Sequence, residues 1–175
     1  MIQHYPKALS HEQCQIIIQS FERSPHKIRG KTGHGGVRKD IKSSTDIHVK
    51  GTQDDLLLNN LEPYYWKYCK QYSFLDRISN MISIDAGYNI QRYLDDEGYF
   101  AEHCEHSPNN PKRVLAWMYY LNDAVCGTTW IHQDYTSTVS EGSLYIWPAF
   151  WTHAHKGVTP NIGRKYIAAG WCSYY

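Results

Sequence analysis

The sequence has no long hydrophobic run and almost no net charge. No stretch approaches the roughly 20 consecutive apolar residues of a membrane-spanning helix, and Met1 to Pro6 lack the basic and apolar regions of a signal peptide. The 18 Lys and Arg and 17 Asp and Glu are interspersed and give a net charge of +1. Such a chain has no strong field to attract a polyanion or a membrane surface. We therefore expect a cytosolic protein with no nucleic-acid partner and no membrane partner.

Paired cysteines and phosphate-binding motifs are also missing. The chain has five cysteines: Cys14, Cys69, Cys104, Cys126 and Cys172. They form no C-x-x-C pair, which argues against a disulfide framework and a thiolate zinc site, so we expect reduced, mostly buried thiols. Cys104 is the exception if it is exposed, because a thiol beside a metal can be oxidised. The glycine-rich segment 30–36 lacks the G-x-x-x-x-G-K-[ST] spacing of a phosphate-binding loop.

The first half of the chain predicts two helices. A capping-box spacing followed by apolar residues at helical intervals predicts a helix over Ser10–Ser24. A stripe of leucines and tyrosines predicts a second helix over about Gln53–Tyr72, which Pro63 kinks or divides. The segment 25–42 is rich in Gly, Lys and His without periodicity, so we expect a mobile loop that acts as a lid or faces the substrate.

The second half alternates β-branched and aromatic segments with turn residues. After a short strand at Ser44–Val49, the predicted strands are Ile82–Ile84, Tyr88–Tyr93, Tyr99–His103, Val114–Leu121, Thr128–Tyr135, Ser143–Trp147, Trp151–Gly157 and Arg164–Trp171. Short strands at this spacing favour a β-sandwich or a closed barrel, and eight strands in two Greek keys would form a jelly roll. Helices covering one sheet would make a mainly β, α+β single domain.

Histidines and one carboxylate predict a metal site. In a strand, His103 and Glu105 project to the same face, and a histidine from a distant strand would complete a set of three. Two histidines and a carboxylate are the ligands of non-haem Fe(II) oxygenases. The chain has ten histidines, so an H-x-E triplet can also arise by chance, and His153 competes with His155 for the third position. His106 and His132 are expected to be structural or exposed.

Further motifs follow in a fixed order along the chain. They are Tyr93, His103-Cys104-Glu105, Arg113, Tyr120-Leu121-Asn122, Gly127-Thr128-Thr129, His155-Lys156-Gly157, Lys165 and Trp171. This ordered set resembles the Fe(II)/2-oxoglutarate dioxygenases of the prolyl 4-hydroxylase type. The chain departs from the family pattern in Glu105, where Asp is usual, in Cys126, which replaces a glycine, and in Trp130-Ile131, which replaces an aromatic position.

The resemblance implies a fold and a set of cofactors. The fold is a double-stranded β-helix with N-terminal helices packed on one sheet. A single dioxygenase domain would span residues 1–175, with helical support and the lid loop in 1–80 and the jelly-roll catalytic core in 81–175. The cofactor would be Fe(II), with 2-oxoglutarate and dioxygen as cosubstrates and ascorbate as a further candidate.

The resemblance also implies roles for individual residues. His103, Glu105 and His155 would be the catalytic metal ligands, and His155 is favoured over His153 because it opens the motif H-x-G-x-x-P. Lys165 would hold the distal carboxylate of 2-oxoglutarate. The remaining predicted cosubstrate-site residues are Tyr93, Tyr120 and Trp171.

The implied reaction is hydroxylation of a peptidyl or free amino acid side chain, with proline as the first candidate. Decarboxylation of 2-oxoglutarate to succinate would accompany it, and loops 25–42 and 106–112 would decide the substrate. Two alternatives stay open. A non-catalytic, cupin-like jelly roll that binds a metal or small ligand would leave Lys165 and Tyr93 without a task. A nucleic-acid demethylase would carry two arginines after the last ligand, whereas only Arg164 is present here.

Overall fold

The computed structural model describes residues 1–32, 36–158 and 162–175. Residues 33–35 of the predicted lid loop and Pro160 of the H-x-G-x-x-P motif therefore lie outside the described residues. No helix within the described ranges is long and apolar enough to cross a membrane.

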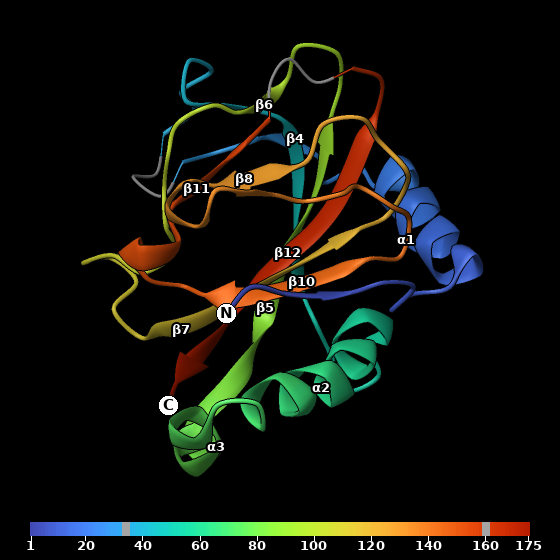
Figure 1. Ribbon diagram of the computed structural model, residues 1–175. Helices are drawn as coiled ribbons and strands as arrows, with labels where there is room; N and C mark the ends of the chain where they lie inside the picture. The colour runs from blue at the N-terminus through green and yellow to red at the C-terminus, as the bar shows by residue number, and fades with distance from the viewer. Residues whose placement is uncertain (33–35, 159–161) are drawn as a thin grey trace.

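Antiparallel sheets form the frame of the molecule (Figure 1). The main sheet has the strand order β1-β10-β7-β12-β5-β4-β2, a second has the order β11-β8-β9, and β3 pairs with β6. The main-sheet strands are β1 (Gln3–Tyr5), β2 (Ile28–Arg29), β4 (Thr45–Lys50), β5 (Ile82–Tyr93), β7 (Arg113–Tyr120), β10 (Leu144–Pro148) and β12 (Lys165–Tyr174). The others are β3 (Lys42–Ser43), β6 (Gly98–Tyr99), β8 (Thr128–Trp130), β9 (Tyr135–Thr136) and β11 (His155–Gly157).

Strand β7 separates two hydrophobic cores. Its side chains alternate, so that Leu115, Trp117 and Tyr119 enter one core while Met118 and Tyr120 enter the other. The first core also holds residues of the helices, and the second contains aromatic residues of the facing sheet. Because both faces of β7 are buried, its sequence is a continuous apolar run rather than an alternating one.

The helices cover one side of the main sheet, away from β8 and β11 (Figure 1). Helix α1 (His11–Arg23) begins as predicted, because the Ser10 hydroxyl accepts from Gln13 N and the Gln13 side chain accepts from Ser10 N. The predicted second helix is shorter, and α2 (Leu56–Cys69) continues through Pro63 without ending there. Proline at this position lies in the third turn, and the helix accommodates it because its apolar face packs on the core.

Several predicted elements differ from the structure. Helix α3 (Ser73–Ile78) and strand β1 were not predicted, and the 25–42 segment contains β2 and the first residue of β3. The predicted strands Ile82–Ile84 and Tyr88–Tyr93 form the single strand β5, because pairing with β12 and β4 carries it across the glycine that suggested a turn. These errors share a cause, since partners distant in sequence decide whether a short segment continues.

Two further strands were predicted too long. A 3-10 helix, η2 (Ile131–Gln133), divides Thr128–Tyr135 into β8 and β9, and another, η3 (Trp151–His153), replaces the first half of Trp151–Gly157. Asp134 ends η2 in the left-handed conformation, which a short polar residue tolerates. The first connects two strands of the second sheet, and the other leads from β10 of the main sheet to β11 of the second.

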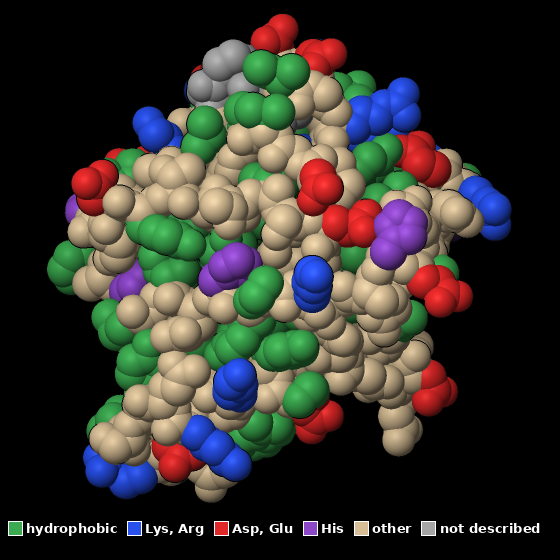
Figure 2. Space-filling view, turned by 45° about the vertical axis from the view of Figure 1, so that its right-hand side comes forward, with side chains coloured by type: hydrophobic (Ala, Val, Ile, Leu, Met, Phe, Trp, Pro, Cys, Tyr) green, Lys and Arg blue, Asp and Glu red, His purple; other side chains and the backbone are tan. Residues whose placement is uncertain are grey.

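The surface carries no dominant patch of one charge on the face that Figure 2 shows, where Lys and Arg are interspersed with Asp and Glu. This distribution agrees with the net charge of +1. Neither sign of charge is concentrated enough on this face to recommend it as a polyanion-binding surface.

Candidate metal centre

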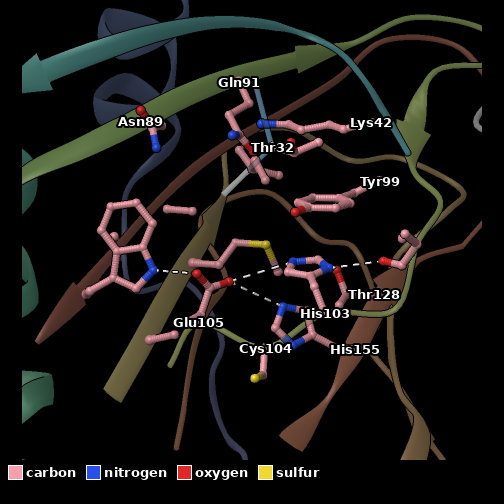
Figure 3. A pocket seen from close by; sticks show the side chains of 18 of the residues that line it. Thr32, Lys42, Asn89, Gln91, Tyr99, His103, Cys104, Glu105, Thr128 and His155 are labelled. Atoms are coloured by element: carbon pink, nitrogen blue, oxygen red, sulfur yellow. Dashed lines mark hydrogen bonds and ion pairs between the residues drawn. The ribbon is translucent and has the colours of Figure 1, made fainter. Parts of the chain in front are cut away.

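His103, Glu105 and His155 meet at one point in the structure. One ligand atom from each lies within 4.8 Å of the other two. Glu105 Oε1 is 3.7 Å from His103 Nε2 and 3.6 Å from His155 Nε2. Figure 3 shows both imidazoles directed toward this carboxylate. The H-x-E pair and the distant His155 therefore form a single cluster.

Backbone pairing holds the two histidines together. His103 N donates to His155 O at 3.0 Å and His155 N donates to His103 O at 2.9 Å, which forms an isolated bridge beside β11. The predicted strand Tyr99–His103 is therefore wrong beyond β6, and Glu105 lies in a bend whose N–H donates to Ala149 O at 3.0 Å. The bridge and this bond fix the cluster without a continuous strand.

Each histidine presents Nε2 to the carboxylate because its other nitrogen is occupied. His103 Nδ1 is 3.1 Å from Ala101 O, and His155 Nδ1 is 2.9 Å from His153 O. A carbonyl oxygen can only accept a hydrogen bond, so Nδ1 carries the proton in both rings. The lone pair of each Nε2 is then directed at the cluster, which is the tautomer that binds a metal.

The electrostatics favour a neutral His103 and an ionised Glu105. Burial, assisted by the neighbouring His155, lowers the pKa of His103 to about 4. Burial acts to raise the pKa of Glu105, but the hydrogen bond and charge of His155 and the charge of His103 outweigh it and lower this pKa to about 2. At neutral pH these two residues thus have the protonation states of metal ligands.

The second oxygen of Glu105 has its own partners. Trp171 Nε1 donates to Glu105 Oε2 at 2.6 Å, and Arg113 Nη1 is 3.6 Å from the same oxygen. The Arg113 guanidinium lies 3.5 Å from the centre of the Trp171 ring, so the two side chains support each other. The indole of Trp171 holds Oε2, while Oε1 faces the two histidines. The two oxygens of Glu105 therefore have different partners.

All the predicted site residues line one cavity of about 590 Å³. Lys165 and Tyr93 are direct partners across β12 and β5, and the Lys165 ammonium is 5.2 Å from the Tyr93 ring. Lys165 Nζ donates to Cys126 O at 2.7 Å, but no carboxylate of the described residues forms an ion pair with it. Burial lowers the pKa of Lys165 to about 8. A buried ammonium without a counter-charge is a receptor for an anion.

The two tyrosines already have hydrogen bonds within the protein. The Tyr93 hydroxyl donates to Gln91 Oε1 at 2.9 Å. The Tyr120 hydroxyl is 2.7 Å from Ser137 Oγ and 3.1 Å from Thr128 Oγ1. Burial raises the pKa of both phenols, to about 12 for Tyr120, so both remain protonated at neutral pH.

The other histidines named from the sequence stay outside the cluster. The expectation that His153 shares a strand and a facing with His155 is wrong, because it ends η3 and its Nδ1 lies 3.0 Å from Thr152 Oγ1. His106 Nδ1 contacts Arg113 O, and His132 is exposed. Cys104 is half-buried, and burial raises the pKa of its thiol, which makes it a weaker nucleophile.

Comparison with known proteins identifies the family. The model of the 2OG-Fe(II) oxygenase superfamily matches residues 88–173, which contain all three members of the cluster. The chain belongs to this superfamily. It is a 2-oxoglutarate-dependent dioxygenase, whose reaction uses Fe(II), 2-oxoglutarate and dioxygen. A search of curated protein sequences finds no match.

Solved structures show that the oxygenase has the double-stranded β-helix fold. A prolyl hydroxylase from Trichoplax adhaerens, in complex with a hypoxia inducible factor peptide, has 14% identity and a TM-score of 0.71 over 99% of this chain and 83% of its own. A Pseudomonas putida prolyl-4-hydroxylase has 11% identity and a TM-score of 0.69 over 98% and 92%. A viral collagen prolyl hydroxylase from Paramecium Bursaria Chlorella virus-1, with 2OG bound, has 14% identity and a TM-score of 0.67 over 99% and 96%.

The cluster of the oxygenase fits an iron ion. Two ligands held about 2.1 Å from one ion at right angles lie about 3 Å apart, so the observed separations of 3.6 and 3.7 Å close with small side-chain movements. Glu105, which is one methylene longer than the usual Asp, lies at a bend, and its carboxylate reaches both histidines. His103, Glu105 and His155 could therefore hold Fe(II) through Nε2, Oε1 and Nε2.

Sequence reasoning missed the polar residues Lys42, Gln91 and Tyr99, which line the cavity, and Asp46, which bonds to Lys42 and Gln91. Tyr99 stacks on His103 with 3.6 Å between ring centres and 11° between planes. Gln91 lies two residues before Tyr93 on the same face of β5. This spacing could have indicated that Gln91 faces the cavity together with Tyr93. Nothing in the sequence pairs Lys42 with this strand.

Proposed function

We propose that the chain hydroxylates an amino acid side chain, in a peptide or free, with proline as the first candidate. Decarboxylation of 2-oxoglutarate to succinate accompanies this reaction. The supporting observation is that the His-Glu-His cluster and the buried cation Lys165 share one cavity. A peptide is the favoured substrate because one similar structure is a prolyl hydroxylase bound to a peptide. The free cysteines of the described residues favour a reducing compartment such as the cytosol.

In this proposal each residue has a task set by its surroundings. His103, Glu105 and His155 hold the iron, and Trp171 keeps the second oxygen of Glu105 away from it. When bound, the iron activates dioxygen with electrons from 2-oxoglutarate, chemistry that the protein side chains cannot supply. Three protein ligands leave positions on the ion for other molecules.

Lys165 would bind the distal carboxylate of 2-oxoglutarate. Lys165 is only 5% exposed. An ion pair with its ammonium is therefore shielded from water and is stronger than an ion pair at the surface. Tyr120 and Tyr93 flank the same end of the cavity and orient the carbon chain of the cosubstrate. Aromatic residues around His155, among them Trp130 and Trp147, exclude water from the reacting atoms.

The proposal is tested first by binding. Anaerobic addition of Fe(II) and 2-oxoglutarate to the chain is expected to give a visible metal-to-ligand charge-transfer band. The band should disappear in His103→Ala and weaken in Lys165→Ala, because the first removes a metal ligand and the second removes the carboxylate partner. An intact chain that gives no band would contradict the proposed site.

The substrate class is tested by turnover. Succinate release in the presence of dioxygen would be measured with proline-containing peptides and with free amino acids, and the product would be examined for an added oxygen. Peptides are expected to stimulate succinate release, and the mass of the proline-containing product is expected to increase by one oxygen atom. Stimulation only by free amino acids would overturn the peptide assignment but keep the hydroxylase.

A further inference from the structure

Four buried polar side chains, three of which line the cavity, form a continuous hydrogen-bonded chain. Lys42 Nζ donates to Asp46 Oδ2 at 2.7 Å, Gln91 Nε2 donates to the same oxygen at 3.3 Å, and the Tyr93 hydroxyl donates to Gln91 Oε1 at 2.9 Å. We call these four residues the Lys42–Tyr93 chain. Each is less than 9% exposed, so water cannot readily replace a lost link.

The polarity of the Lys42–Tyr93 chain is fixed from one end. An ammonium can only donate, and Asp46 accepts from Lys42, from Ser44 and from Gln91. The amide nitrogen of Gln91 must therefore face Asp46, which leaves its carbonyl oxygen toward Tyr93. The Tyr93 hydroxyl proton consequently points at Gln91. Asp46, which Lys42 holds by an ion pair, thus determines through Gln91 how the Tyr93 phenol is oriented.

Lys42 enters the chain from the short strand β3. This two-residue strand pairs with β6, and the neighbouring Ile41 O accepts from Phe100 N at 2.8 Å. Upstream, Gly30 N donates to Ser44 O at 2.9 Å, and a Cβ on Gly30 would meet Ser44 Oγ and lie 3.1 Å from Lys42 Cε. Glycine at position 30 is therefore needed for the backbone of this segment to lie against the chain. The chain therefore requires Lys42 of β3 to lie against Asp46 of β4, which in turn bonds to Gln91 of β5.

The two ends of the chain reach different parts of the proposed active site. Tyr93 lies beside Lys165, whose ammonium is 5.2 Å from the phenol ring. Lys42 Nζ is 5.6 Å from the centre of the Tyr99 ring, and Tyr99 stacks on His103. Figure 3 shows Lys42, Gln91 and Tyr99 together on the side of the cavity facing His103. Lys42 thus lies beside the tyrosine that stacks on the metal-ligand candidate His103.

We propose that Lys42 is a positioning residue for 2-oxoglutarate, which acts by holding Tyr93 through Asp46 and Gln91. The proposal rests on the proposed function and assigns to Lys42 a control over cosubstrate affinity. With Lys42 paired with Asp46, Tyr93 is oriented beside Lys165. Removing Lys42 leaves the buried carboxylate of Asp46 without its cation, and a shift of Asp46 displaces Gln91 and the Tyr93 hydroxyl, which follow it in the chain.

A purely structural role for Lys42 makes a different prediction. A buried ion pair that only stabilises the fold would, when broken, weaken the binding of every ligand together with the fold itself. A positioning role weakens 2-oxoglutarate binding and leaves metal binding nearly unchanged, since the three metal ligands are held by their own backbone bonds. The two roles are separated by measuring both affinities on the same folded variant.

The experiment measures the binding of Mn(II) alone, and then of 2-oxoglutarate to the Mn(II) form, by titration calorimetry. Lys42→Met is expected to raise the Kd of 2-oxoglutarate about tenfold and to change the Kd of Mn(II) less than twofold. Lys42→Arg, which keeps a cation and donors toward Asp46, should recover most of the 2-oxoglutarate affinity. Lys39→Met is the matched control, because Lys39 is exposed in the same segment.

Gln91→Leu gives an independent variant, because it removes the middle link and leaves the Lys42 to Asp46 ion pair intact. It should weaken 2-oxoglutarate binding as Lys42→Met does, with a melting temperature that shows a folded protein. Unchanged 2-oxoglutarate affinity in folded Gln91→Leu, or an equal loss of Mn(II) and 2-oxoglutarate affinity in folded Lys42→Met, would overturn the proposal. Failure of the unsubstituted chain to bind 2-oxoglutarate would instead contradict the proposed function.

Discussion

Lys165 differs from Lys42 and Arg113 in having no acidic partner among the described residues. Lys42 pairs with Asp46, and Arg113 lies beside Glu105. Removing an ammonium from water without a counter-charge is costly, and the protein reduces this cost by a single bond to Cys126 O. A carboxylate bound in the cavity would provide the missing partner, which is why the affinity for 2-oxoglutarate should depend on the charge of this one residue.

This dependence predicts a pH effect. Burial lowers the pKa of Lys165 to about 8, so the ammonium is present below that pH and is lost above it. The 2-oxoglutarate affinity should be constant near pH 7 and should fall by up to about tenfold per pH unit above pH 8, because binding then requires uptake of one proton. Calorimetric titrations of the Mn(II) form between pH 6.5 and 9.5 would measure it. Lys165→Arg should remove the dependence, and an unchanged slope in that variant would contradict the assignment.

Trp171 is predicted to act through Glu105. Replacing it by Phe removes the 2.6 Å hydrogen bond to Oε2 while keeping an aromatic ring against Arg113. Loss of such a partner to a metal ligand typically weakens metal binding by about 10- to 100-fold. The Mn(II) affinity of Trp171→Phe should fall within this range, as measured by titration calorimetry. Trp66→Phe, at an exposed position on α2, is the control, and equal affinities of the two variants would exclude this role.

At the scale of elements, local signals in the sequence predicted those parts that depend on local interactions. The capping residues Ser10 and Gln13 bond as their spacing indicates, so the limits of α1 are nearly those predicted. The limits of β5, β6, β8 and β11 depend on partners up to about a hundred residues away, and a single sequence does not specify where pairing stops. The 3-10 turns η2 and η3 have no periodic signature and were missed for the same reason.

The cap of α1 gives a prediction at this scale. Ser10→Ala removes the acceptor of Gln13 N and half of the capping box, which should lower the free energy of unfolding by about 1 kcal/mol. Ser20→Ala, at an exposed position inside the same helix, should have no effect or a slightly stabilising one, because alanine is the better helix former. Urea unfolding followed by circular dichroism would compare the two, and equal midpoints would contradict the cap.

For the molecule as a whole, the residues of the candidate site were easier to predict from the sequence than the residues that surround the site. The two ends of the cavity, at His103 and at Lys165, were found from motif order, and so was the carboxylate at Glu105. The Lys42–Tyr93 chain was not found, because its members come from β3, β4 and β5 and their contacts exist only after the sheet has formed. The sequence motifs identify residues whose side chains take part in the chemistry. The residues of a supporting network can be recognised only from their contacts in the folded structure.

Binding of metal and cosubstrate should stabilise the whole fold. A ligand that binds only the folded state at about 100 times its Kd adds about 2.7 kcal/mol to the free energy of unfolding. Thermal denaturation should therefore shift to higher temperature with Mn(II) and again with 2-oxoglutarate, and removal of Mn(II) by a chelator should reverse the shift. His103→Ala should show neither shift, and a shift retained in that variant would place the ion elsewhere.

The reciprocal backbone bridge between His103 and His155 has a consequence for the life of the enzyme. Two of the three proposed iron ligands are neighbours because of main-chain bonds, and those bonds persist whichever side-chain partner is present. Iron could thus depart and return without any refolding of the protein. Such an oxygenase could lose its iron when iron is scarce and regain activity when iron binds again.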